Sequence, residues 1–493
     1  MTADVRGTRR LSLPSILVFS AGSLPVAALA TAIFVYLPPY FASHLGVSLT
    51  SIGAAWAIVR MIDLVVDPAI GLLMDRTRTS YGRYRVWLVA GAPILMAGVY
   101  ALFMAPAHFS TLYLIAWMLV MYLGQSMLAL SHAAWAAVLA TNYHERSRVF
   151  GILAAVGICG AISVMVFPLF ATDTGWAVRA MGWSVLIATP FVVGLTAWRT
   201  PERINQDHQT DIVGLRDYWL IAKRPEVMRL FLAQMSLTLG PGWMSALYMF
   251  FFTQALGFSQ GIATWLLIIY IVAGVVGAPV TGRVATHLGK HRTLMLTTTA
   301  YSLGLCCIIF VVKGNFWTAM PIMVWCGFMA AGFDLMIRAM MADVGDEVRL
   351  EQGKERISLL YAITTLASKL ASAFAIALTF PLLAYLGFDP AEGAKNTADA
   401  IYSLSWAYLA GPIVFVMLGG ACFYGWKLDA QKHAGIRSEL EARDALYEEA
   451  PIIESVSASP AIPVLVTAAM PDDAETLTPD QNTVSPADRS AAE

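Results

Sequence analysis

Apolar segments of about twenty residues recur along most of the chain, and each can cross a hydrocarbon layer of about 30 Å as a helix. Only 13% of the 493 residues are charged, whereas soluble domains carry about 25%, which argues against one large soluble core. The predicted spans lie near 13–41, 48–74, 86–106, 110–140, 148–172, 177–199, 227–256, 262–286, 292–313, 316–342, 357–388 and 400–427. We therefore predict an all-α membrane protein of about twelve transmembrane helices in a lipid bilayer.

Basic residues gather in every second connector between these spans. Arg76, Arg83 and Arg85 follow the second span, and Lys290 and Arg292 follow the eighth. The connectors in between contain almost no basic residue. The positive-inside rule then places both termini in the cytoplasm and requires an even number of spans. This pattern is expected of a multi-pass protein of a cell inner membrane.

The longest internal connector, residues 200–226, is polar and charged. We interpret it as a cytoplasmic loop between two six-helix halves, residues 1–199 and 227–427. The tail, residues 428–493, differs in composition: its first part is charged and is expected to form a surface helix, and the part from Pro451 onward is expected to be disordered.

Weak internal similarity supports two parallel halves. Gly82 precedes a basic pair after the second span, and Gly289 precedes another after the eighth. Parallel repeats of this kind are typical of the major-facilitator fold. The alternative for the second copy is an ordinary basic loop, since Thr286 stands where the first copy has Asp75.

Composition also bears on partners. The net charge of −1 gives no basic face of the kind that a nucleic-acid partner needs. The five cysteines all fall inside apolar segments, which fits neither a disulfide framework nor a metal site. We expect a monomer with a small-molecule substrate and no cofactor.

Ionisable residues inside a span cost about 2.5–3.5 kcal/mol each and mark functional pathways. The second span carries Arg60, Asp63 and Asp67. The two aspartates are four residues apart and share one helix face, so they either hold a cation between them or share a proton. Arg60 lies on the same face, and a structural ion pair is the alternative interpretation. Pro68 leaves one backbone carbonyl of this helix without its usual partner.

The eleventh span carries one charge, Lys369, in an apolar environment. A lone ammonium group at mid-span needs a carboxylate partner from another helix, and Asp63 and Asp67 are the natural candidates. Such a pair would link charge neutralisation to the closure of the two halves. Snorkelling of the lysine to an interface is the alternative.

The tenth span carries Asp334 and Arg338, again four residues apart. Either they form an internal ion pair or they contact the substrate. Asp343 and Asp346 follow at the predicted cytoplasmic end, with Asp343 about 13 Å from Asp334 along the helix at 1.5 Å per residue.

The fourth span offers Ser131, His132 and Trp135 as candidate substrate contacts, and the eleventh offers Thr365. A histidine can titrate near physiological pH, and a tryptophan can stack on a sugar ring. His132 is equally well explained as a satisfied core residue, and Trp135 as a packing residue.

Two segments resemble the glycoside–pentoside–hexuronide:cation symporters, whose best-known member is the melibiose carrier. The first segment runs from Arg60 through Asp67-Pro68 to Trp87, and the second runs from Met341 to Lys369. Both occur in the family's order and spacing, and the resemblance covers most of residues 13–427.

The resemblance implies roles for individual residues. Asp63 and Asp67 would be the cation-site carboxylates, with Na⁺ as one possible ion, and Lys369 would face them. Trp135 would lie near the sugar. The cytoplasmic gating loops are implied by the resemblance to contain Asp75, Arg83, Arg85, Asp343 and Asp346.

This chain also departs from the family pattern. Val66 and Leu128 stand where the melibiose carrier has an asparagine and an ion-holding threonine, which leaves a site poor in oxygen and favours a proton over Na⁺. The galactoside-binding acids are absent, with Ser131 at the helix-four position, and Asp334 replaces a tryptophan. Galactoside specificity is therefore not expected, and related animal members carry lysophospholipids.

We expect a transporter that couples a cation, a proton before sodium, to a small solute such as a sugar, glycoside or uronide. The alternatives are an exporter or carrier of an amphiphilic or lipid-like compound, a membrane enzyme, and a sensor that signals through the tail. The enzyme is disfavoured because the sequence shows no metal-ligand spacing, phosphate loop or nucleophile elbow.

Overall fold

The computed structural model describes residues 12–77, 79–107, 109–139, 143–171, 173–202, 221–352, 357–391 and 393–448. All regular elements within these residues are helices. Contacts assign the chain up to Glu441 to one compact unit and the remainder to a second. Most of the predicted connector 200–226 and the tail beyond residue 448 lie outside the described residues.

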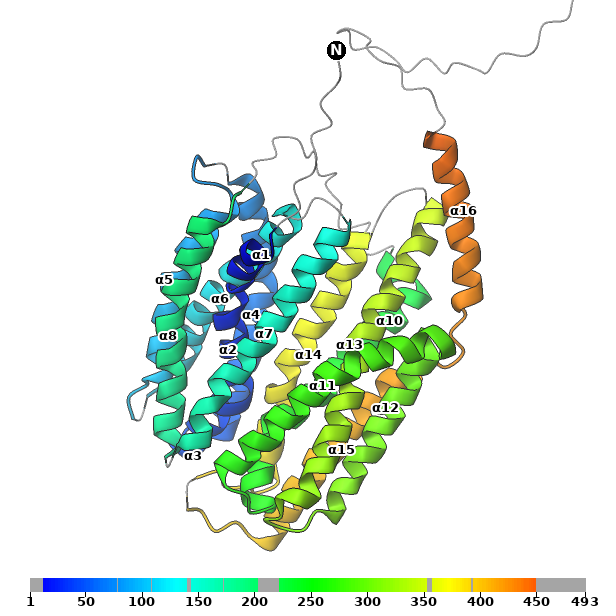
Figure 1. Cartoon of the computed structure of the whole chain (residues 1–493). Coiled ribbons are helices and arrows are strands. Elements are labelled where there is room, and N and C mark those ends of the chain that lie inside the picture. Colours follow the sequence, from blue (N-terminus) through cyan, green and yellow to red (C-terminus); the bar gives the residue numbers. More distant parts are fainter. Residues whose placement is uncertain are drawn as a thin grey trace, which may run out of the picture. The chain divides into compact units, whose positions relative to one another are not determined.

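An N-terminal helix group is formed by residues 12–199, and a C-terminal helix group by residues 225–421; Figure 1 shows them side by side. The N-terminal group contains α1 (Leu13–Ser20), α2 (Ser23–Thr31), η1 (Ala32–Tyr36), α3 (Leu37–Ser43), α4 (Leu49–Arg76), α5 (Tyr84–Phe103), α6 (Thr111–Leu139), α7 (Tyr143–Phe170) and α8 (Thr174–Arg199). The C-terminal group contains α10 (Pro225–Phe250), η2 (Phe251–Ala255), α11 (Gln260–Leu288), α12 (Lys290–Cys306), η3 (Cys307–Phe310), α13 (Phe316–Gln352), α14 (Ile357–Tyr385) and α15 (Ala398–Ala421). A further helix, α16 (Ala430–Glu448), follows and agrees with the expected surface helix.

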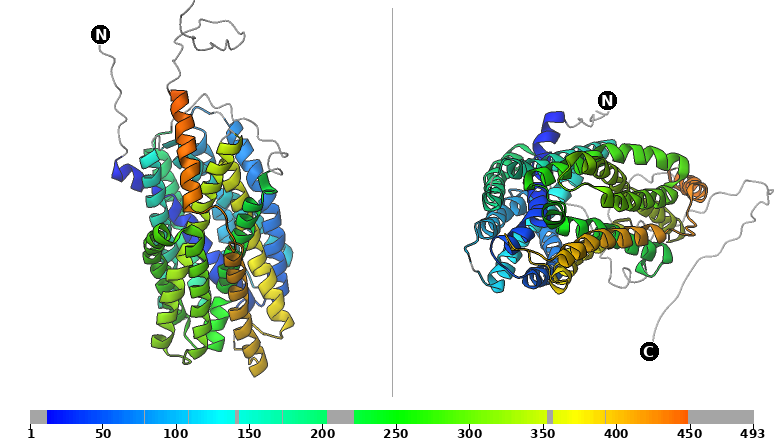
Figure 2. Two further views of the ribbon diagram at one scale, coloured as in Figure 1. Left: turned by 90° about the vertical axis from the view of Figure 1, so that its right-hand side faces the viewer. Right: turned by 90° about the horizontal axis from the view of Figure 1, so that it is seen from below.

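Long helices that follow one another along the chain run in opposite directions, as the views in Figure 2 show. The end at which α4 finishes and α5 begins is here called the arginine-rich end, and the other is called the distal end. At the distal end α4 begins with the hydroxyl of Ser48, and α8 with the carboxylate of Asp173, each accepting a backbone N–H of the first turn. These caps satisfy helix donors that would otherwise lack partners.

Ten helical segments within the described residues are long and apolar enough to span a membrane. The helices α4 and α10 are not among them, although they have 28 and 26 residues. Helix α4 carries three charged residues near its middle, Arg60, Asp63 and Asp67, and α10 interrupts its apolar residues with Gln234 and Pro241. Both helices pack against α14, which is itself one of the ten.

Most helix boundaries fall within a few residues of the predicted spans. The largest difference is in α13, which continues to Gln352, ten residues beyond the predicted end at 342. The predicted end lies before the acidic residues Asp343 and Asp346. The helix continues because their carboxylates contact basic side chains of α12 and α16.

The two helix groups share local features at corresponding places. Gly82 and Gly289 both adopt positive φ angles, 112° and 86°, directly before the helices α5 and α12. The first long helical path of each group also contains a π-helical segment, η1 and η2, towards the distal end. These pairs support the internal repeat that the sequence indicates.

The helices α4 and α14 approach closely near the distal end. A Cβ atom at Gly53 would lie 2.8 Å from Cδ of Pro381, whereas one at Gly71 of the same helix would meet open space. We expect Gly53→Ala to destabilise the purified protein by about 1–3 kcal/mol through overpacking. Gly71→Ala is the matched control, since both variants gain the same helix propensity. Thermal melting should show a lower midpoint for Gly53→Ala only, and equal midpoints would contradict this packing.

Candidate functional site

Lys369 of α14 lies between two carboxylates of α4, so it joins the two helix groups near their middle. Its Nζ forms an ion pair with Asp67, and it lies 3.6 Å from Oδ2 of Asp63. The side chain of Asp63 is only 5% exposed. The structure thus brings together the three residues that the sequence analysis selected for coupling.

Arg60 completes this cluster. Its guanidinium lies 3.3 Å from Oδ2 of Asp63 and is stacked 4.2 Å above the ring centroid of Tyr122 from α6. A second aromatic ring, Phe34 of η1, lies 5.2 Å away. Two carboxylates therefore face two cationic side chains, which offsets part of the cost of burying each charge.

A hydroxyl group from α6 also reaches the cluster, and the sequence analysis missed it. Ser126 donates a hydrogen bond of 3.2 Å to Oδ1 of Asp63. Leu128, at the position that the resemblance assigned to an ion-holding threonine, is buried in apolar packing. Ser126 precedes Leu128 by two residues. Only the packing of α4 on α6 shows that the hydroxyl of Ser126 is the group of α6 that contacts Asp63.

One carboxylate oxygen of the cluster is unused. Oδ1 of Asp67 is buried and has no hydrogen-bond partner among the described residues. A buried acceptor in this state is costly to leave unpaired.

Asp334 and Arg338 of α13 form an ion pair with each other at 2.6 Å. Their side chains are 56% and 70% exposed, so this pair is accessible, unlike the cluster around Asp63. Tyr361 of α14 donates to the carbonyl oxygen of Arg338 at 3.5 Å, and the hydroxyl of Thr365 donates to the carbonyl oxygen of Tyr361. These candidate substrate contacts therefore lie together on α13 and α14, one turn or more from Lys369.

The candidates on α6 are placed differently. His132 is stacked on Phe19, and its Nε2 lies 2.8 Å from the carbonyl oxygen of that residue. Ser131 donates to backbone carbonyls of its own helix. Trp135 is fully buried and donates to the carbonyl oxygen of Pro201 at 3.3 Å. In this conformation all three are engaged by the protein itself.

The loop at the arginine-rich end of the N-terminal group is organised by Glu202, which the sequence analysis also missed. Its carboxylate accepts the backbone N–H groups of Arg83, Tyr84 and Arg85 at 2.6–3.1 Å. These are the first N–H groups of α5, where a negative charge is favoured by the helix dipole. A Cβ atom at Gly82 would collide with the same carboxylate.

The arginines of this loop bind backbone carbonyls. Arg83 donates to Met74 at 2.9 Å, and Arg85 donates to Thr200 at 2.8 Å. The side chain of Asp75 lies outside the described residues.

The acidic end of α13 binds basic residues from two helices. Asp343 accepts two hydrogen bonds, of 2.6 and 2.8 Å, from Nζ of Lys290 in α12. Nε2 of His433 in α16 lies 3.0 Å from Oδ2 of Asp346 and 3.4 Å from Oδ1 of Asp343. The two predicted gating aspartates thus share one cationic environment.

Helix α16 extends these contacts. Lys432 donates to Glu347 at 2.6 Å, and this hydrogen bond raises the pKa of Lys432. Arg437 lies 3.9 Å from Asp346. Within the described part of the chain, no three His, Cys, Asp or Glu side chains come together as a set of metal ligands.

Ten apolar spans, two helix groups with repeated features and an ion-pair cluster at their junction define a multi-pass membrane transport protein. A sequence profile described as MFS/sugar transport protein matches residues 18–430. The chain belongs to the major facilitator superfamily and, within it, to the glycoside–pentoside–hexuronide:cation symporter family. The resemblance drawn from the sequence is therefore confirmed.

Individual relatives are distant. The isoprimeverose transporter of Lactiplantibacillus pentosus is 22% identical over 80% of this chain and 84% of its own length. The sodium-dependent lysophosphatidylcholine symporter 1-B of Danio rerio is also 22% identical, over 87% of this chain and 90% of its own length. The crystal structure of the nucleoside transporter NupG superposes with a TM-score of 0.63 at 12% identity, covering 84% of this chain and 98% of that one. This last likeness concerns the fold alone.

Proposed function

We propose that this chain is a cation-coupled secondary transporter of a small sugar-like solute in the inner membrane. The observation that supports it most is the bridge from Lys369 of one helix group to Asp63 and Asp67 of the other. In this proposal, α4 and α10 complete twelve spans in two six-helix halves, with residues 200–226 between them. The arginine-rich end then faces the cytoplasm, in agreement with the positive-inside rule.

The cluster supplies a coupling mechanism. Neutralisation of Asp67 by a cation weakens its attraction to Lys369, and with it one link between the halves. The halves then rock apart at one end and expose the substrate site to the other side. A bound ion or solute shifts this equilibrium only by its differential affinity for the two states.

A proton is the preferred coupling ion. Asp63 is contacted by three donors, namely Arg60, Ser126 and Lys369. Sodium requires several oxygen ligands, whereas a proton requires one free carboxylate oxygen, and Oδ1 of Asp67 is buried without a partner among the described residues.

The substrate assignment rests on the family, whose profile is named for sugar transport. Asp334, Arg338 and Thr365 are proposed substrate contacts on the accessible face of α13 and α14. Ser131, His132 and Trp135 are proposed to contact substrate only in another conformation, since each is engaged here.

The test is uptake of a panel of glycosides, pentosides and uronides into energised vesicles, with and without a protonophore and with and without Na⁺. Accumulation that the protonophore abolishes supports proton symport and identifies the solute class. Accumulation that requires Na⁺ would identify Na⁺, and not the proton, as the coupling ion. If no compound of the panel accumulates, the proposal is contradicted.

Ser126→Ala tests whether the hydroxyl of Ser126 is a ligand of Na⁺. This hydroxyl contacts Asp63 and not Asp67, so a proton-coupled protein that uses Asp67 should keep its half-maximal proton concentration within about twofold. If the hydroxyl is instead a Na⁺ ligand, half-maximal uptake should require about tenfold more Na⁺, which corresponds to a loss of about 1.4 kcal/mol. Ser163→Ala, which removes only a bond to the carbonyl of Gly160, is the control.

A carrier of amphiphilic or lipid-like compounds is the second candidate. The relative named as a lysophosphatidylcholine symporter covers nearly the whole chain, and the galactoside-binding acids of the melibiose carrier are absent here. Lysophospholipids therefore belong in the panel, and their accumulation in place of sugars would select this function.

Truncation of the tail separates a transporter from a sensor that signals through its tail. We expect removal of residues 449–493 to leave the initial uptake rate within about twofold of the full chain, because the proposed coupling and substrate residues all precede this segment and chain termini often tolerate truncation. Uptake assays at matched protein levels measure this. A loss of uptake with normal protein levels would show that the tail takes part in transport.

A further inference from the structure

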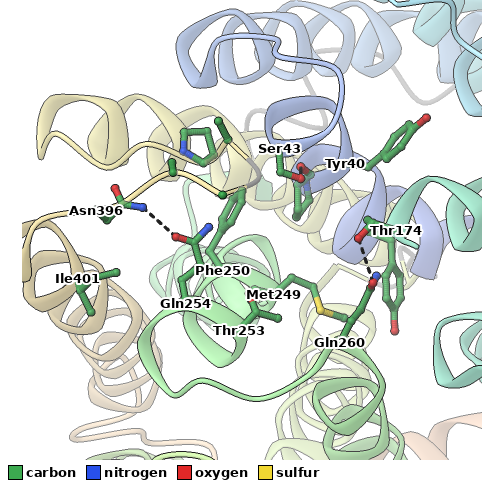
Figure 3. Close-up of a pocket in the computed structure, with 16 residues that line it drawn as sticks. Tyr40, Ser43, Thr174, Met249, Phe250, Thr253, Gln254, Gln260, Asn396 and Ile401 are labelled. Carbon is green, nitrogen blue, oxygen red and sulfur yellow. Dashed lines mark hydrogen bonds between the residues drawn. The ribbon is translucent and has the colours of Figure 1, made fainter. Parts of the chain in front are cut away.

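A cavity of about 520 Å³ lies at the distal end, away from the Asp63 cluster. Figure 3 shows side chains from both helix groups around it. Tyr36, Ser43 and Thr174 belong to the N-terminal group, and Gln254, Gln260 and Ile401 to the C-terminal group. Its size suits one small organic solute, since ligand pockets occupy about 300–1,000 Å³.

The polar groups of this cavity are amides and hydroxyls. Oε1 of Gln254 accepts a 2.9 Å hydrogen bond from Asn396, and Oε1 of Gln260 accepts one of 3.1 Å from Thr174. Neither bond uses the Nε2 group, so each glutamine keeps its two N–H donors for a ligand. Asn396 is itself fixed by two hydrogen bonds with the backbone of Asp389, which orients Gln254.

The remaining walls are apolar or aromatic, and none of the described lining residues is charged. Tyr36, Tyr40 and Phe250 supply rings. An ionic ligand would lose its hydration without gaining a counter-ion from these described residues. Fixed amide donors beside aromatic faces suit a neutral molecule that carries many hydroxyl groups and an apolar ring face.

The cavity also depends on the conformation. Two hydrogen bonds between the helix groups border it, Thr174 with Gln260 and Tyr36 with Thr264 at 3.2 Å. The π-helical segments η1 and η2 both contribute lining residues, and such segments are frequent at functional sites. Opening of the distal end would separate these walls.

We propose that this cavity is a second binding site, for a neutral polyhydroxylated solute of mono- to disaccharide size, and that its occupancy holds the two helix groups together at the distal end. A ligand that binds only this conformation stabilises it at the expense of the opened one. High concentrations of such a solute on the distal side therefore slow transport. This last consequence rests on the proposed function, whereas the binding itself does not.

The experiment measures equilibrium binding to the purified full-length protein in nanodiscs. The probes are tritiated xylose, glucose, lactose and sucrose, with glucuronate as the charged comparison. Thr253→Trp fills the cavity and Gln254→Ala removes an amide, so either variant should raise the Kd of the bound neutral sugar at least about tenfold. Lys395→Ala, an exposed residue of the same 389–397 loop that does not line the cavity, is the matched control and should leave Kd unchanged.

Asp67→Asn separates this site from the coupling cluster, and the proposal expects it to retain neutral-sugar binding. The proposal is overturned if no probe binds, if Thr253→Trp and Gln254→Ala bind normally, if Gln254→Ala weakens glucuronate binding as much as neutral-sugar binding, or if Asp67→Asn alone removes binding. Melting curves show whether each variant is folded. If Thr253→Trp does not fold, the Kd of Gln254→Ala alone tests the site. None of these outcomes depends on concentrative uptake, which tests the proposed function separately.

Discussion

Asp67→Asn is expected to abolish concentrative uptake. The change removes the carboxylate that pairs most closely with Lys369 and leaves the ammonium group with Asp63 at 3.6 Å. A poorly compensated charge in a span costs about 2.5–3.5 kcal/mol, and about 1.4 kcal/mol corresponds to a factor of ten. We therefore expect accumulation against a gradient to fall about 60- to 300-fold.

Uptake into energised vesicles, corrected for the amount of folded protein, measures this effect. Asp67→Glu is the matched control, because it keeps a carboxylate and should retain part of the coupling. An asparagine variant that still concentrates its substrate would rule out Asp67 as a coupling group.

Lys369→Gln is expected to lower thermal stability strongly, and a second substitution should restore it. Removing one partner of a fully buried ion pair costs about 3–5 kcal/mol, because the other charge remains buried. Lys369 and Asp67 are partly buried, with 26% and 14% of their side chains exposed, so we expect Lys369→Gln to cost about 3 kcal/mol, the lower end of this range, by leaving the carboxylate of Asp67 without its partner. The double variant Lys369→Gln/Asp67→Asn removes both charges, so its melting midpoint should return most of the way to that of the parent protein, while uptake stays lost.

A double-mutant cycle of melting midpoints checks this coupling. Arg338→Gln provides the comparison, since its partner Asp334 is exposed and exposed pairs contribute only about 0–1 kcal/mol. If the double variant is no more stable than Lys369→Gln alone, the two residues do not compensate each other in the folded protein.

The helices were predictable because a membrane imposes a single length on every span. The capping residues Ser48 and Asp173, which begin α4 and α8 at the distal end, were not used in the sequence analysis. The end of α13 was not predictable, because Asp343 and Asp346 look like the end of an apolar helix until their partners on α12 and α16 are known. Charge in a sequence signals the end of a span only when the charge is unpaired.

The coupling cluster was predictable for a related reason. A lysine in the middle of an apolar span requires a carboxylate partner. The apolar spans contain few carboxylates, so Lys369 could be matched with Asp63 and Asp67 from the sequence alone. Ser126 carried no comparable signal, because serine is common in apolar helices and usually donates to its own backbone, as Ser131 does. The distal cavity was missed because its amides and hydroxyls come from five helical elements and the loop before α15.

Glu202 has a consequence for the order in which the chain is made. The first turn of α5 is complete only when this carboxylate, more than 110 positions later in the sequence, accepts its three N–H groups. During synthesis, the acceptor of these donors is therefore absent until translation has passed α8. A fragment meant to fold as the N-terminal helix group should accordingly extend through residue 202 instead of stopping at 199.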